Sequence, residues 1–260
     1  MAYQPFDLTG QVALVTGGNG GIGLGMAEAL AQAGADLVIW GSNPDKTAAA
    51  EARLEAIGGR VLSRVVDVSD EHAVAAGMTA AVEAMGAVHT VIANAGVSGK
   101  GQPFAETTTE SYRKVLAVNL DGVFFTFREA CRHMIDRAKA GDPGGSLVVI
   151  SSLSAVEGAP RNEPYASTKA AVLAMTRGVA VEHARYGVRA NAILPGWIAT
   201  EMTGDAQGSQ VFTDKVITRV PARRWGQPAD FGGLAVYLAS GASSFHTGDS
   251  FIVDGGYGIF

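Results

Sequence analysis

Residues 11–23 read Gln11-Val12-Ala13-Leu14-Val15-Thr16-Gly17-Gly18-Asn19-Gly20-Gly21-Ile22-Gly23, and the fold class follows from these residues more than from any others. The first six form a short apolar run with β-branched side chains that stops at glycines, which predicts a buried strand. Residues 24–33 are rich in alanine and precede Gly34, so they are predicted to form a helix. Glycines at a strand-to-helix turn let the backbone approach a pyrophosphate, and the helix N-terminus offers it free N–H groups. These residues therefore favour dinucleotide binding over a merely flexible turn.

The glycine loop fits two known fingerprints. Gly18-x-Gly20-x-x-Gly23 has the common dinucleotide spacing, and Thr16-Gly17-x3-Gly21-Ile22-Gly23 has another. The residues alone leave both registers open.

Strands and helices alternate along the rest of the chain. Apolar runs predict strands at residues 36–40, 61–66, 88–92, 147–150, 188–194 and 251–253. Helical patterns cover residues 44–57, 71–85, 111–139 and 164–184, and a further helix is expected after Pro228 and Asp230. This alternation is typical of βαβ units and a parallel sheet covered on both faces, with ligands beyond the carboxyl ends of the strands. We therefore expect an α/β fold of the Rossmann-type, doubly wound class.

The chain shows no linker-like stretch, so we expect one dinucleotide-binding and catalytic domain over residues 1–260. Residues 203–220 lack a clear periodicity. They are interpreted as a mobile flap over the substrate site.

Composition argues against several classes of function. A net charge of −5 is unfavourable for nonspecific nucleic-acid binding, and no basic-aromatic stripe is present. Cys131 is the only cysteine and the five histidines are not spaced as a zinc pair, so neither a disulfide nor a metal site is expected. No apolar run reaches the 18 or more residues that span a bilayer, and the first ten residues do not resemble a signal peptide. We expect a cytoplasmic protein that works without a membrane.

The end of the second predicted strand bears on the choice of dinucleotide. An acidic residue about twenty positions after the glycines commonly binds the adenosine ribose, but Gly41-Ser42-Asn43 occupies this place. Neither a carboxylate that would reject a 2′-phosphate nor an arginine that would bind one is present, and Lys46 is the only nearby cation. The sequence favours NAD, with NADP possible.

Tyr165 and Lys169 are predicted to share one face of the helix at residues 164–184, because four positions make about one turn. A phenol ordinarily ionises at about pH 10. An ammonium about 5 Å away, at an effective dielectric constant of about 20, stabilises the phenolate by roughly 3 kcal/mol, or about two pKa units. A tyrosine tuned in this way can exchange a proton with an alcohol or a ketone. The alternative is a solvated pair on a helix face.

Two further polar residues, Asn119 and Ser152, can be interpreted either as catalytic or as purely structural. Asn119 interrupts an apolar helical series, where an amide is often a satisfied structural residue. Ser152 follows the strand at residues 147–150, where a serine can also cap a turn.

Taken together in this order, the motifs resemble the short-chain dehydrogenase/reductase family over essentially the whole chain. The matching residues are Thr16-Gly17-x3-Gly21-Ile22-Gly23, Asp67-Val68, Asn94-Ala95-Gly96, Asn119, Ser152, Tyr165-x3-Lys169 and Pro195-Gly196-x-Ile198-x-Thr200. Two positions depart from the family pattern. Gly41-Ser42 occupies the ribose-recognition position, and Ala93 stands where an asparagine is common.

The resemblance implies a catalytic role for each of four residues. Tyr165 would be the general acid/base, and Ser152 would hydrogen-bond the substrate oxygen. Lys169 would bind the nicotinamide ribose and lower the tyrosine pKa, while Asn119 would hold a water that completes a proton relay. Substrate contacts are expected at Ser152, Ser154, Tyr165 and Trp197.

The resemblance also implies a cofactor site, a sheet topology and an assembly. Cofactor contacts are expected at Gly17, Asn19, Gly21, Ile22, Gly23, Ser42, Asp67, Val68, Asn94, Ala95, Gly96, Tyr165, Lys169, Pro195, Gly196, Ile198 and Thr200. The family's sheet has seven parallel strands in the order 3-2-1-4-5-6-7. Its members are usually homodimers or homotetramers, which use the helices at residues 111–139 and 164–184 as a contact.

These observations predict an NAD(P)-dependent oxidoreductase that moves hydride between the nicotinamide and a small secondary alcohol or ketone. Members that reduce 3-oxoacyl groups and members that oxidise sugar acids or polyols both fit the sequence. A protein of another class, a dinucleotide-binding sensor or scaffold without turnover, is the alternative. The complete set of Asn119, Ser152, Tyr165 and Lys169 argues against it.

Overall fold

The structure, a computed structural model, describes residues 4–99 and 101–260. Its centre is one seven-stranded parallel sheet in the order β3-β2-β1-β4-β5-β6-β7, which confirms the expected fold class and strand order. The strands are β1 (Val12–Thr16), β2 (Asp36–Gly41), β3 (Val61–Val65), β4 (Thr90–Ala93), β5 (Gly145–Ile150), β6 (Val188–Pro195) and β7 (Ser250–Val253). β1 and β4 are neighbours in space although two strands separate them in sequence. The strand order reverses there, and a cleft is expected beyond the carboxyl ends of such a pair.

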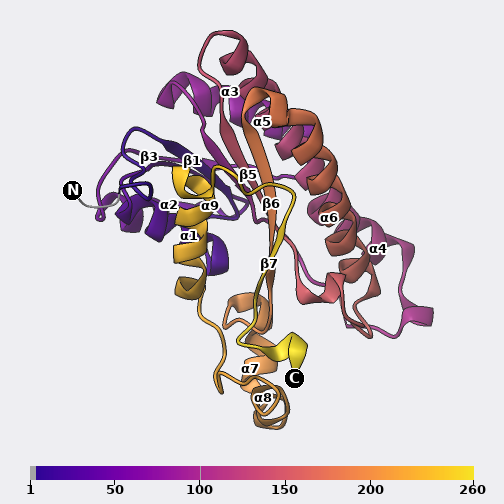
Figure 1. Ribbon diagram of the computed structural model, residues 1–260. Helices are drawn as coiled ribbons and strands as arrows, with labels where there is room; N and C mark the ends of the chain where they lie inside the picture. The colour runs from indigo at the N-terminus through magenta and orange to yellow at the C-terminus, as the bar shows by residue number, and fades with distance from the viewer. Residues whose placement is uncertain (1–3, 100) are drawn as a thin grey trace.

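Helices cover both faces of the sheet (Figure 1). Their bounds are α1 (Gly21–Gln32), α2 (Pro44–Glu55), α3 (Glu71–Met85), α4 (Thr109–Leu116), α5 (Gly122–Lys139), α6 (Glu163–His183), α7 (Gly204–Gly208), α8 (Gln210–Ile217) and α9 (Gly232–Ala239). α1, α2 and α9 contribute to the core on one face, and α3, α5 and α6 to the core on the other. The central strands read as continuous apolar runs because both of their faces are buried.

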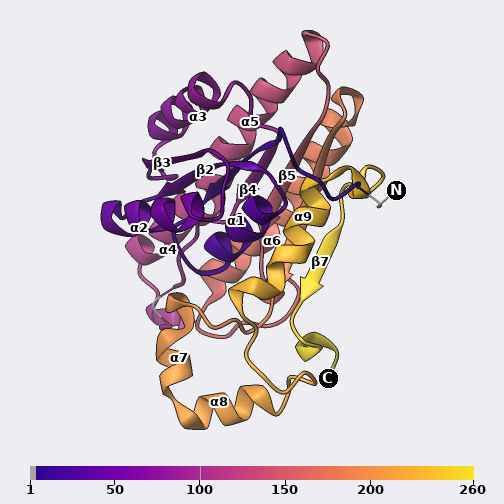
Figure 2. The ribbon, with the colours of Figure 1, turned by 90° about the vertical axis from the view of Figure 1, so that its left-hand side faces the viewer.

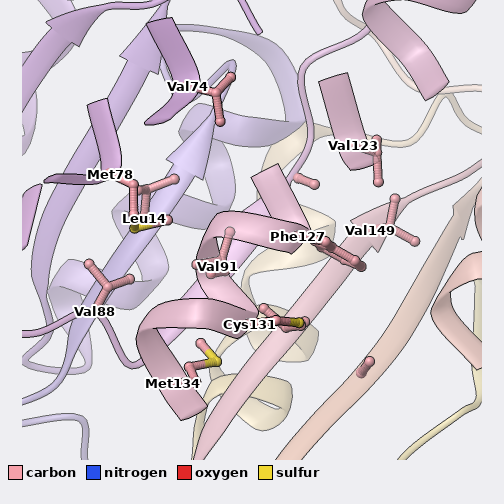
Figure 3. Close-up of a cluster of buried hydrophobic side chains, with 14 of the residues drawn as sticks. Leu14, Val74, Met78, Val88, Val91, Val123, Phe127, Cys131, Met134 and Val149 are labelled. Carbon is pink, nitrogen blue, oxygen red and sulfur yellow. The ribbon is translucent and has the colours of Figure 1, made fainter. Parts of the chain in front are cut away.

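The core beneath α3 and α5 joins helix and strand side chains directly. Figure 3 shows Met78 and Phe127 lying over Leu14, Val91 and Val149 of the central strands. Phe127 is 2% exposed and the three strand residues are fully buried. Burial of a large side chain of this kind contributes about 1.5–3 kcal/mol, so these contacts fix the helices on the sheet.

The long helix expected at residues 111–139 is present in the structure and contains one irregular turn. α4 and α5 are separated by a π-helical turn at Ala117–Asp121, and the buried Asn119 lies within it. Such wider turns are common at functional sites. The prediction of a long helix is therefore confirmed, with a π-helical turn that the sequence pattern did not indicate.

Residues 203–220, which the sequence predicts to be a mobile flap, contain regular secondary structure. They hold α7 and α8, which extend as an arm from the main body (Figures 1 and 2). The Ser209 side chain caps the first turn of α8 by accepting a hydrogen bond from the Phe212 N–H. Only Val216 of α8 is buried, so the segment has no apolar stripe that a periodicity search would find.

Two imidazoles satisfy backbone groups at the amino edge of the sheet. His89 Nδ1 accepts a bond from the Val12 N–H at 2.9 Å, and His133 Nε2 accepts one from the Val88 N–H at 3.0 Å. An imidazole nitrogen accepts only when it carries no proton. Burial, and then the nearby Arg137 guanidinium, lower the pKa of both histidines.

Within the described parts of the chain, no helix is both long enough and apolar enough to cross a membrane.

Candidate active site

A cleft of about 530 Å³ opens at the carboxyl edge of the sheet. Most of the residues singled out from the sequence line it, although they come from the ends of six strands and from α6. They are Gly17, Asn19, Gly21, Ile22, Ser42, Asp67, Val68, Asn94, Ala95, Gly96, Ser152, Tyr165, Lys169, Pro195, Gly196, Ile198 and Thr200. A parallel sheet brings such strand ends to one edge, so residues distant in sequence meet in one cleft.

The floor of the cleft is the glycine loop between β1 and α1. Gly17 and Gly21 have φ angles of 62° and 51°, in the left-handed region that favours glycine. Among the described residues, no side chain caps the N-terminus of α1, which follows Gly20. A cradle of glycine backbone beside an open helix N-terminus fits a pyrophosphate.

Asn94 fastens the end of β4 to this loop. Its Nδ2 donates to the carbonyl oxygens of Thr16 and Gly17 at 3.0 and 3.1 Å, and its backbone N–H donates to Thr16 Oγ1. Gly23 does not line the cleft but lies against these groups. A methyl group there would meet both Gly17 O and Asn94 Nδ2 at less than 3.0 Å. Gly23 therefore permits close packing of α1 on β1.

Asn19, within the glycine loop, links this loop to the start of α2. Asn19 Nδ2 donates to Thr47 Oγ1 at 3.1 Å, and Thr47 Oγ1 in turn donates to the Asn43 carbonyl oxygen at 2.7 Å. A side chain at Gly41 would collide with Asn19, so the end of β2 has to be glycine while this network is present. The glycine loop and the start of α2 are thereby fixed relative to one another.

Lys169 is 3% exposed and lies one helical turn from Tyr165 in α6. Its Nζ donates to the Ile150 carbonyl oxygen at 2.7 Å and lies 5.4 Å from the centroid of the Tyr165 ring. Burial lowers the pKa of the Lys169 ammonium to about 8. The predicted juxtaposition of the two side chains is confirmed, and the alternative of a solvated pair is excluded.

The direction of the tyrosine shift differs from the prediction. Burial raises the pKa of the Tyr165 phenol, and its interaction with the Ser152 hydroxyl offsets this only in part. The sequence estimate counted the attraction between phenolate and ammonium but not the cost of removing the phenolate from water. The predicted direction of the shift was therefore wrong, because the pKa of Tyr165 is raised rather than lowered.

Asn119 bonds to the loop that follows β4. Its Oδ1 accepts from the Val97 N–H at 2.8 Å, and its Nδ2 donates to the Val97 carbonyl oxygen at 2.9 Å. A methyl group built on Gly96 would lie 3.3 Å from Asn119 Oδ1 and 3.6 Å from Lys169 Nζ. The amide thus holds the loop, and the amide oxygen and the ammonium both lie near Gly96.

Ser152 Oγ also accepts a bond from the Ser154 N–H at 3.1 Å, which fixes the turn after β5. Ser154 and Trp197 are not among the residues that line the cleft. Trp197 lies in an aromatic cluster with Phe212, Trp225 and Tyr257, at ring separations of 5.1, 6.0 and 6.4 Å. This cluster joins the arm formed by α7 and α8 to the C-terminal segment.

Sequence reasoning missed several cleft residues, among them Lys46, Glu201, Met202 and Thr203. Lys46 stood out only as the one cation near the end of β2. The other three follow Thr200 and carried no motif signal of their own.

Comparisons with known proteins agree with this geometry. A family model described as enoyl-(acyl carrier protein) reductase matches residues 17–258. Gluconate 5-dehydrogenase of Gluconobacter oxydans is 39% identical over 251 residues, which are 96% of each chain. The NADP-dependent (R)-specific alcohol dehydrogenase of Lentilactobacillus kefiri is 39% identical over 254 residues, covering 96% of this chain and 97% of its own.

Solved structures extend the similarity to three dimensions. The crystal structure of a gluconate 5-dehydrogenase from Burkholderia cenocepacia, in complex with NADP and tartrate, superimposes with a TM-score of 0.91. It is 36% identical in sequence, and the match covers 98% of this chain and 97% of that one. With a parallel seven-stranded sheet, a glycine cradle and a paired tyrosine and lysine at one cleft, the chain belongs to the short-chain dehydrogenase/reductase family.

Proposed function

We propose that this protein is an NAD(P)-dependent oxidoreductase that interconverts a secondary hydroxyl and a ketone on a sugar acid, with Tyr165 as the general acid/base. The observation that carries the proposal is the meeting of Ser152, Tyr165 and Lys169 at one end of the cleft. Relatives named for gluconate and keto-gluconate favour a sugar acid over a 3-oxoacyl substrate.

The dinucleotide fits the residues present. Gly17, Gly21 and the N-terminus of α1 form the cradle for its pyrophosphate, while Asp67 and Val68 line the adenine end. Pro195, Ile198 and Thr200 line the cleft on the nicotinamide side. When bound, the dinucleotide supplies or accepts the hydride. NAD is the expected cofactor, and NADP also fits because relatives use it.

Residues of the chain itself donate and accept the proton that the substrate oxygen gains or loses in the reaction. Because the pKa of Tyr165 is raised, its phenol keeps the proton at neutral pH and is ready to donate it to a carbonyl oxygen. Ser152 positions that oxygen with its hydroxyl. In the oxidative direction the phenol must ionise, and a charged Lys169 one turn away favours the phenolate. Because burial lowers the pKa of Lys169 to about 8, this help fades above that pH, and oxidation is expected to accelerate from neutral pH only up to about that value.

Asn119 and Lys169 complete the proton path in this proposal. Asn119 holds the loop at Val97, and its Oδ1 and Lys169 Nζ both lie near Gly96, which lines the cleft. A carboxamide oxygen has a second lone pair, so it can also accept a hydrogen bond from a water on the path to Lys169.

Substitution of Tyr165 by phenylalanine tests the proposal. Turnover, followed by absorbance at 340 nm with gluconate, keto-gluconate, 2-alkanols and a 3-oxoacyl thioester, should fall by roughly 10²–10⁴-fold. The dissociation constant for NADH should change little. Tyr186→Phe, remote from the cleft, is the matched control. Turnover that survives within about tenfold refutes the acid/base assignment, and dinucleotide binding without turnover on any substrate favours a sensor.

We also propose that the arm of α7 and α8 covers the substrate within a single catalytic domain. Phe212 of α8 packs on Trp197, which follows the Pro195-Gly196 segment of the cleft, and this contact supports the role. Deletion of the arm should raise KM for the substrate more than the dissociation constant for NADH.

A homodimer or homotetramer is proposed as the working assembly. Phe124 on α5 and Val181 on α6 are 45% and 83% exposed, and both lie on the helices that are expected to form the contact between copies. Light scattering measures the mass directly, and a monomer would refute this part.

A further inference from the structure

Lys46 and Glu201 form an ion pair across the mouth of the cleft, and both line it. Lys46 lies in the first turn of α2, directly after the end of β2. Glu201 follows Thr200 after the end of β6, and 155 positions separate the two residues in sequence. Only the fold brings them together, above the glycine loop.

The backbone is held firmly on both sides of this pair. The Lys46 N–H donates to Asn43 Oδ1 at 3.0 Å, which fixes the start of α2. On the other side, Thr203 Oγ1 donates to the Ile198 carbonyl oxygen, and Gln207 Nε2 donates to the Thr200 carbonyl oxygen at 3.0 Å. The contact between the two side chains therefore follows from two fixed anchors.

The charges that line the cleft make Lys46 distinctive. Among the described residues of the lining, the cations are Lys46 and Lys169. Lys169 is buried at the far end and donates to a carbonyl oxygen. Lys46 is half-exposed and lies beside Gly41 and Ser42, the end of β2 at which folds of this class bind the adenosine ribose. An anionic group on that ribose would lie close to Lys46. The Lys46 ammonium, however, is already paired with the carboxylate of Glu201.

We propose that Glu201 sets the cofactor preference by competing with the ribose 2′-phosphate of NADP for Lys46. The inference rests on the proposed dinucleotide-dependent function and adds a specificity residue to it. NAD has a hydroxyl at this place and leaves the ion pair intact. NADP binds in full only when Lys46 turns from the carboxylate of Glu201 to the phosphate. The carboxylate therefore disfavours NADP by holding the cation that the 2′-phosphate needs.

Dissociation constants for NADH and NADPH, measured by fluorescence titration at low ionic strength, test this inference. Glu201→Gln should tighten NADPH binding by about three- to fivefold, because an exposed ion pair contributes only modestly, while NADH binding should stay within about twofold. Lys46→Met should weaken NADPH binding, and in that background Glu201→Gln should have no further effect. The fragments 2′,5′-ADP and 5′-AMP should reproduce the contrast, because they isolate the 2′-phosphate.

Asp205→Asn is the matched control, since it removes one exposed negative charge from the same segment without touching Lys46. An equal gain from Asp205→Asn, or an equal shift for NADH and NADPH in Glu201→Gln, would assign the effect to general charge and overturn the inference. Unchanged selectivity in Glu201→Gln would overturn it too. In each of these cases, turnover by the wild-type protein would still support the proposed function. If the protein bound neither NADH nor NADPH, both the proposed function and the role of Glu201 would be refuted.

Discussion

Replacement of Asn119 by leucine separates two roles for this amide. The substitution removes both bonds to Val97, at 2.8 and 2.9 Å, and leaves one N–H and one carbonyl group without protein partners. An unsatisfied buried group costs about 1–3 kcal/mol. Val97 is only half-buried, so water offsets part of this and we expect a loss of about 2–3 kcal/mol. For a chain of this size the midpoint of thermal unfolding should fall by about 4–10 °C.

Asn191→Leu is the matched control for this experiment. Asn191 is also fully buried, and its amide likewise holds a loop through His246 O and the Asp249 N–H, away from the cleft. Calorimetry should show similar losses of stability for the two variants. Turnover at 20 °C below each midpoint should fall by about tenfold or more only in Asn119→Leu, because the loop beside the cleft moves. An unchanged midpoint together with lost turnover would refute the loop-holding role and leave proton relay alone.

Two further perturbations act on packing and on charge. Gly23→Ala should weaken NADH binding and lower stability together, because its methyl group meets the Gly17 carbonyl oxygen at less than 3.0 Å; unaltered calorimetry and titration would contradict this. Acid should destabilise the fold through His89 and His133, whose pKa values are lowered by burial. The unfolded chain binds these protons first, so stability is fully present above about pH 6.5 and is lost as the pH falls below it. The double variant His89→Asn, His133→Gln keeps neutral acceptors, and its unfolding midpoint should depend less on pH between 5 and 7; an equal dependence would refute the assignment.

The centre of the sheet was predictable because β1, β2, β4, β5 and β6 are buried almost throughout and read as apolar runs. The catalytic pair was predictable from its spacing of four, since a helix converts that spacing into proximity. Burial of Tyr165 was not predictable, because it depends on segments far away in sequence. The π-helical turn at Asn119 was hidden for the same reason: the amide within it bonds to Val97, which lies 22 positions away in sequence. For α8, Ser209 was an available capping signal, but the helix buries too little to show a periodicity.

The π-helical turn at Ala117–Asp121 has a consequence for how this chain tolerates change in length. A wider turn accommodates about one residue more than the α-helical path, and each helical residue turns the side chains by about 100°. Deletion of a single residue here would let α4 run into α5 as one uninterrupted rod. Because the wider turn takes up the extra residue, α5 would keep its rotation and Phe127 its place over the strands, whereas the contact of Asn119 with Val97 would be lost. A one-residue deletion should therefore disturb the packing of α5 less within this five-residue stretch than elsewhere in α4 or α5, and should act mainly on the loop that Asn119 holds.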